Sequence, residues 1–126
     1  MKKIDCETAL ILHELVADVS GGAVGTRDIN LLESSLSSCF QTFSGVELYP
    51  SIEEKGAFLG FSLIKNHAFI DGNKRIGLLI MLTFLEINGV ILKFTDDELI
   101  TLGLGVASSE ISYDELLNFI KTHMQP

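Results

Sequence analysis

Residues 73–87 constrain the fold most, because a helix over this stretch has no continuous polar face. Its apolar residues cover nearly the whole circumference of such a helix: Ile76, Leu78, Leu79, Ile80, Met81, Leu82, Phe84, Leu85 and Ile87. The pair Asn88-Gly89 then supplies residues that commonly end a helix. A helix that is apolar all round must be surrounded by protein, so we expect it at the centre of the fold.

Three further helices are predicted from the way in which each one starts. A hydroxyl residue is followed three positions later by glutamate at Ser51 and Glu54, at Thr95 and Glu98, and at Ser112 and Glu115. In this capping box the hydroxyl accepts a hydrogen bond from a backbone N–H of the first turn, and the glutamate accepts one from the N-cap N–H. We therefore predict helices over about residues 52–66, 96–108 and 113–124.

The N-terminal part of the chain predicts two more helices. An apolar stripe with the i, i+3, i+4, i+7 spacing of one helix face indicates a helix over about residues 5–20: Leu12, Leu15, Val16 and Val19. The glycine-rich stretch 21–25 breaks it, and Thr26 or Asp28 can cap a shorter helix with three leucines at positions 31, 32 and 36. Residues 40–50 contain Ser44-Gly45 among aromatic and β-forming residues, so we expect a loop or a two-stranded flap there.

Together these elements predict an all-α fold, a compact bundle of five to six helices with room for a small β-hairpin. With 126 residues, 47% apolar and 21% charged, the chain 1–126 fits a single packed domain. The net charge of −8 disfavours nucleic acid as a partner, because an acidic surface repels phosphate backbones. No apolar run reaches the ~20 residues of a membrane span, and no export signal is evident, so we expect a cytoplasmic protein without membrane contact.

Residues 66–75 are unexpectedly polar for a connection between an amphipathic helix and the apolar central helix. Gly72 and Asn73 stand where the central helix begins. Backbone N–H groups and the positive end of the helix dipole can hold phosphate oxygens at such a point. Lys74 and Arg75 add two positive charges at the same place. This segment therefore predicts an anion-binding cradle.

Two more side chains indicate what this cradle would do. Asp71 suits an anion site only if it serves a cation, and Mg²⁺ characteristically binds a carboxylate together with phosphate oxygens. His67, four residues earlier, can accept a proton from a hydroxyl near neutral pH. Alone, each residue has an ordinary interpretation as a surface histidine or a loop before a helix cap. Within nine residues they predict phosphate-ester chemistry.

Three aromatic side chains are assigned structural roles. Phe69 is interpreted as a core residue that fixes the polar loop. His13 and His123 lie far from this loop in the sequence, and we expect them at the surface or at helix ends.

The segment His-Ala-Phe-Ile-Asp-Gly-Asn-Lys-Arg at residues 67–75 resembles the signature of the Fic/Doc family, and more closely that of its death-on-curing toxin branch, His-x-Phe-x-Asp-(Gly/Ala)-Asn-Lys-Arg. The resemblance extends to residues 25–28, 32–34 and 47–50. It implies a compact helical bundle in which this loop joins two central helices. The implied roles are general base for His67, Mg²⁺-linked carboxylate for Asp71, anion-hole backbone for Gly72 and Asn73, and phosphate contacts for Lys74 and Arg75.

Two departures bear on the reaction that the resemblance implies. The AMP-transferring branch continues its signature as Gly-Asn-Gly-Arg-x-x-Arg, whereas this chain has Lys74 in place of the second Gly and Leu78 in place of the second Arg. The death-on-curing branch instead implies a toxin that transfers the terminal phosphate of ATP to a hydroxyl of a target protein. Elongation factor Tu is the suggested target and arrest of translation the suggested outcome. Transfer of AMP is the alternative.

The sequence also leaves two other functional classes open and indicates a protein partner. An inactive interaction module and a metal-dependent nuclease stay open as alternatives, although the nuclease would need further histidine ligands and a basic groove. Self-inhibited members of the family carry Ser or Thr four residues before Glu, a spacing that occurs nowhere in this sequence. We therefore expect inhibition in trans by a separate antitoxin protein.

Overall fold

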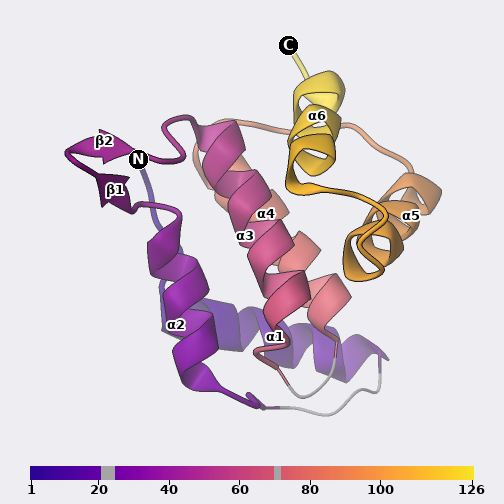
Figure 1. Cartoon of the computed structure of the whole chain (residues 1–126). Coiled ribbons are helices and arrows are strands. Elements are labelled where there is room, and N and C mark those ends of the chain that lie inside the picture. Colours follow the sequence, from indigo (N-terminus) through magenta and orange to yellow (C-terminus); the bar gives the residue numbers. More distant parts are fainter. Residues whose placement is uncertain (21–24, 70–71) are drawn as a thin grey trace.

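A computed structural model describes residues 1–20, 25–69 and 72–126. These residues form six α-helices and one two-stranded antiparallel sheet, arranged as in Figure 1. In chain order the elements are α1 (Cys6–Ser20), α2 (Ile29–Ser38), β1 (Thr42–Phe43), β2 (Val46–Glu47), α3 (Ile52–Asn66), α4 (Asn73–Ile87), α5 (Asp96–Ala107) and α6 (Tyr113–His123). The predicted all-α fold with a small hairpin is confirmed.

The helix ends follow the local signals in the sequence. All three capping boxes form, at Ser51, Thr95 and Ser112, and Asp28 caps α2 by accepting a hydrogen bond from the N–H of Asn30. The central helix α4 ends before Gly89, which adopts a φ of +87°. Most of the predicted glycine-rich break at 21–25 lies outside the described residues.

Helix α4 lies at the centre, as its composition predicts, and packs most extensively against α3. One group of buried side chains joins α4 to α1 and α2, and a second joins it to α5 and α6. Glycines let α3 and α4 approach closely, since a Cβ added at Gly77 would lie 2.8 Å from Ile64 Cγ1 and 3.3 Å from the Gly60 carbonyl oxygen. In the described part of the chain, no helix is both long and apolar enough to cross a membrane.

The prediction for the buried face of α1 was wrong in part. Leu15 is 56% exposed, whereas His13 is only 2% exposed and lies between the buried Ala9 and Ala17 on one stripe of the helix. The buried stripe of α1 therefore combines two small alanines with one imidazole, which fills the space that they leave in the core. The expectation that His13 lies at the surface or at a helix end is therefore corrected. His123 does lie in the last turn of α6, as predicted.

The hairpin forms at residues 42–47, with Thr42 paired to Glu47 and Phe43 to Val46. Ser44 and Gly45 both have positive φ, as a tight two-residue hairpin turn requires. Glu47 and the Tyr49 carbonyl accept hydrogen bonds from the buried Lys55, in the first turns of α3. The signature loop follows the other end of α3, so this hairpin does not cover it (Figure 1).

Candidate active site

The candidate site lies at the connection between the two central helices. Helix α3 ends at His67, whose backbone is left-handed with φ +53° and ψ +48°. Helix α4 starts after Gly72, which is also left-handed, with φ +75°. Two left-handed residues, one of them a glycine, thus stand at the two ends of the connection between α3 and α4.

A cleft of about 270 Å³ collects the predicted residues in one place. Its lining is Ile64, His67, Gly72, Asn73, Lys74, Arg75 and Ala107. The structure thus brings the predicted base together with the four predicted phosphate-binding residues, and Ala107 contributes the end of α5. Asp71, the predicted metal ligand, lies outside the described residues.

The charge at the start of α4 is opposite to the usual pattern. Helices α3, α5 and α6 each carry acidic residues in their first turn, which suit the positive end of the helix dipole. The first turn of α4 carries no acid and instead presents the exposed Lys74 and Arg75. Cations at this end cost about 0.3–1 kcal/mol each, so the arrangement favours a site that receives an anion.

The side chain of Asn73 braces the loop that precedes it. Its Oδ1 accepts a hydrogen bond from the N–H of Phe69, and its Nδ2 donates one to the Phe69 carbonyl, each at 3.0 Å. Phe69 is buried, as predicted for a core residue. The sequence analysis assigned only the backbone of Asn73 to the anion hole and did not predict this side-chain function.

Arg27 is a second residue whose contribution the sequence analysis did not identify. Its Nε donates to the His67 carbonyl at 2.8 Å, and its Nη2 donates to the Asn66 carbonyl at 3.0 Å. The backbone N–H groups of Arg27 and Asp28 both donate to the Ala68 carbonyl. Residues 27 and 28 therefore bind the backbone at the end of α3 and fix the position of the backbone that carries the His67 imidazole. The sequence analysis included Arg27 only as part of the family resemblance of residues 25–28.

Asn66 joins the same backbone to α2. Its Nδ2 donates to Ser35 Oγ at 2.7 Å and to the Leu31 carbonyl at 3.2 Å, while its Oδ1 accepts from the N–H of Ala68 at 3.1 Å. Ser35 Oγ in turn lies 2.6 Å from Ser62 Oγ of α3. The residues just before and after His67 are thus held by side chains from several elements.

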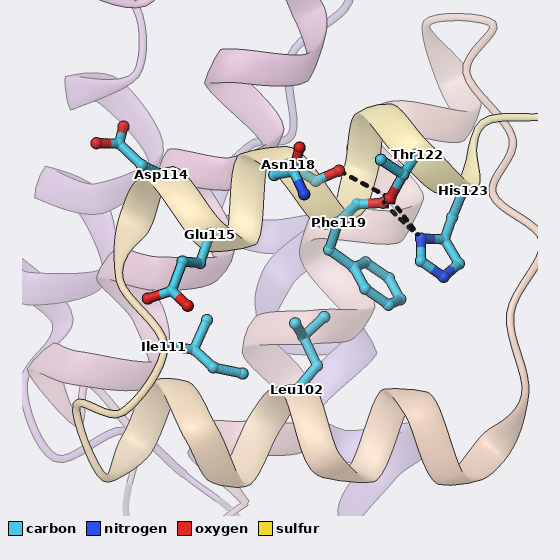
Figure 2. A pocket seen from close by; sticks show the side chains of 8 residues that line it. All are labelled: Leu102, Ile111, Asp114, Glu115, Asn118, Phe119, Thr122 and His123. Carbon is cyan, nitrogen blue, oxygen red and sulfur yellow. Dashed lines mark hydrogen bonds between the residues drawn. The ribbon is translucent and has the colours of Figure 1, made fainter.

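A larger hollow lies between α5 and α6, where Figure 2 shows Leu102, Ile111 and Phe119 along its floor. It measures about 470 Å³ and is bordered by Asp114 and Glu115. The acidic border of this hollow would repel a phosphate, so the smaller cleft is the better candidate for an anion site.

The residues present are compatible with Mg²⁺ bound together with a phosphate ligand. Among the described residues, no group of three His, Cys, Asp or Glu side chains could hold a metal ion. A Mg²⁺ ion held with substrate phosphates needs only one or two carboxylates, since phosphate oxygens and water complete its shell. In the sequence, Asp71 directly precedes Gly72 and would supply that carboxylate, although it lies outside the described residues.

Comparison with known proteins supports the sequence resemblance. A family model described as the Fic/DOC family matches residues 3–85. A protein named Toxin Doc from Mycolicibacterium smegmatis (strain ATCC 700084 / mc(2)155) is 44% identical over 70 residues. The alignment covers 56% of this chain and 54% of that protein, so the chain matches about half the length of the relative.

Proposed function

The chain belongs to the Fic/DOC family, and we propose that it is a toxin of the death-on-curing type that transfers the terminal phosphate of ATP to a hydroxyl of a target protein. The observation that carries this proposal is the cleft in which His67 meets the cationic start of α4. The resemblance of residues 67–75 to the death-on-curing signature supports elongation factor Tu as the target. Such a target places the reaction in the cytoplasm.

In the proposed reaction, His67 accepts the proton of the target hydroxyl while the hydroxyl oxygen bonds to the terminal phosphorus of ATP. The bond from that phosphorus to the bridging oxygen breaks, and ADP leaves with the bonding electrons. Backbone N–H groups at Gly72 and Asn73 and the charges of Lys74 and Arg75 stabilise the transferring phosphoryl oxygens. Mg²⁺, when held by Asp71 and phosphate oxygens, would supply further charge neutralisation.

Two positions favour transfer of the terminal phosphate over transfer of AMP. Lys74 lines the cleft with a long cationic side chain where AMP-transferring relatives have glycine. Leu78, where those relatives have a second Arg, is only 5% exposed, and a Cβ added at Gly103 of α5 would lie 3.1 Å from its Cδ1. An apolar side chain packed against α5 offers no grip on the diphosphate that AMP transfer releases.

The test uses ATP labelled separately at the first and at the terminal phosphate, with purified elongation factor Tu and Mg²⁺. We expect label on the target from the terminal phosphate alone, and none with His67→Asn or in excess EDTA. Label from the first phosphate alone would establish AMP transfer instead. ATP binding without transfer of either label to this target or to any lysate protein would favour an inactive interaction module.

We also propose that a separate antitoxin protein inhibits the activity. The proposal rests on the absence from the sequence of the Ser/Thr-to-Glu spacing found in self-inhibited relatives, and on Leu78 in place of the Arg that such a Glu would grip. Expression of this chain alone should arrest growth, and the His67→Asn variant should not. Normal growth at high expression of the folded wild-type protein would contradict the proposal.

A further inference from the structure

His13 occupies an unusual place for a histidine. It lies in the middle of α1, it is 2% exposed, and its neighbours on the buried stripe are Ala9 and Ala17. An imidazole in a core carries the cost of removing its ring nitrogens from water, which a leucine or valine at this position would not incur. The contacts of this particular ring are therefore informative.

The imidazole stacks on one described flank of the signature loop and lies near the other. Its ring stacks on the ring of Phe69, with 4.1 Å between centroids and 19° between planes. On the other flank, His13 Nε2 lies 4.0 Å from the position that a Cβ at Gly72 would occupy. One side chain from α1 thus stacks on the residue before positions 70 and 71 and lies near the residue after them.

Phe69 and Gly72 are both directly connected to the candidate site. Phe69 is hydrogen-bonded through its backbone to Asn73 and follows His67 by two residues. Gly72 is the N-cap of α4 and lines the cleft. A displacement of the Phe69 ring would therefore move the anion cradle relative to the imidazole of His67.

We infer that His13 is a positioning residue for the proposed phosphoryl transfer, acting through its stack on Phe69. This inference rests on the proposed function. Among the described residues, none from α1 lines the cleft. The inference nevertheless gives α1 a function, because His13 would fix the distance between the base His67 and the phosphate cradle. Misplacement by about 1 Å can cost a hundredfold in rate, so the effect is measurable.

The experiment compares three variants of the full chain. His13→Ala removes the ring, and His13→Phe keeps a flat ring against Phe69. Leu36→Ala, near the C-terminal end of α2, removes volume from the core cluster that also contains Phe69. Two quantities are measured: kcat with saturating ATP and elongation factor Tu, and amide hydrogen exchange at Phe69 and Asn73 without nucleotide.

We expect His13→Ala to lower kcat by roughly tenfold to a hundredfold and to speed exchange at Phe69 by about tenfold. Leu36→Ala should lower the melting temperature while changing neither quantity by more than about threefold. His13→Phe should restore slow exchange at Phe69 and most of kcat. If His13→Ala fails to fold, His13→Leu takes its place, because leucine fills the core without a ring and should still speed exchange at Phe69 and lower kcat.

Two outcomes would overturn the inference. In the first, His13→Ala and Leu36→Ala change kcat and exchange equally, which indicates a general core effect. In the second, a folded His13→Phe variant is no better than His13→Ala, so that stacking is not how the residue acts. Failure of the proposed function is recognised separately, because wild-type protein would then transfer no label from the terminal phosphate, while the exchange measurements still report on Phe69 and Asn73.

Discussion

Asn73 and Phe69 form a closed pair of hydrogen bonds, in which one side-chain amide binds both the N–H and the carbonyl of one backbone residue. Asn73→Ala would leave the partly buried Phe69 N–H without this partner. We expect a loss of about 1–3 kcal/mol in the free energy of unfolding, measured by urea denaturation. Asn118→Ala, at an exposed position of α6, is the control and should lie within about 0.5 kcal/mol of wild type. Equal stability of the two variants would contradict a bracing role.

Arg27 holds the carbonyls of Asn66 and His67 at the end of α3. Arg27→Ala should reduce stability by about 1 kcal/mol, because two carbonyls lose their donors and the helix end loses a favourable charge. Transfer should fall further than stability alone explains, since the backbone of His67 is no longer fixed. The matched control is Lys121→Ala, which removes an exposed cation from the last turn of α6. If Arg27→Ala were as active as Lys121→Ala, Arg27 would not be needed to fix the backbone of His67.

His67 itself combines a reactive side chain with left-handed backbone. Asn tolerates this conformation better than Ala does, so His67→Asn should be more stable than His67→Ala by up to about 1 kcal/mol. Both variants should lose transfer if the imidazole is the base. Thermal melts and labelled-ATP assays of the two proteins separate these effects. A stable His67→Asn protein with wild-type transfer would remove His67 from the reaction.

Gly77 and Gly103 are both helical glycines with different surroundings. A Cβ at Gly77 would meet the Gly60 carbonyl at 3.3 Å and Ile64 Cγ1 at 2.8 Å, whereas a Cβ at Gly103 would meet only side-chain atoms, the nearer at 3.1 Å. Gly77→Ala should therefore destabilise by about 1–3 kcal/mol despite the gain in helix propensity. Gly103→Ala should be neutral or stabilising by up to about 1 kcal/mol. Urea denaturation of both variants tests whether close approach of α3 and α4 explains the difference.

The pair His123 and Glu98 predicts a pH dependence of stability. His123 Nε2 lies 2.7 Å from Glu98 Oε2, and this hydrogen bond raises the pKa of His123 above its ordinary 6.5. The pKa of Glu98 is lowered below its ordinary 4.5, mainly by the hydrogen bond from the Thr95 N–H and to a smaller extent by the hydrogen bond with His123. The histidine contribution is complete below pH 6.5 and is lost as pH rises through the raised pKa. The glutamate contribution is complete above pH 4.5 and is lost as pH falls through the lowered pKa.

The difference in melting temperature between wild type and His123→Gln should therefore be largest between pH 4.5 and 6.5, and smaller at pH 8 and at pH 3. Glu98→Gln is the control, because Gln keeps the acceptor of the capping box but cannot hold a charge on His123. In the Glu98→Gln background, the additional difference in melting temperature caused by His123→Gln between pH 4.5 and 6.5 should disappear. A difference that stays constant with pH would indicate that only the stack of His123 on Phe119 matters.

The sequence by itself determined where the helices begin and end. Ser51, Thr95 and Ser112 start helices because their hydroxyls bind N–H groups only three residues away, and Gly89 stops α4 because its positive φ suits glycine. The residue types around His67 likewise pointed to an anion site, since charges at a helix start act over one turn. Such interactions are local, so the order of residues is enough to recognise them.

Only the tertiary structure decided which face of α1 is buried and what holds the loop. The spacing of Leu12, Leu15 and Val16 fits a buried face, yet α1 buries the stripe of Ala9, His13 and Ala17 and leaves Leu15 exposed. The bonds from Arg27 to the end of α3 join residues about 40 positions apart. Periodicity within one helix carries no information about such partners, because packing depends on the shapes of distant segments that meet only when the chain folds.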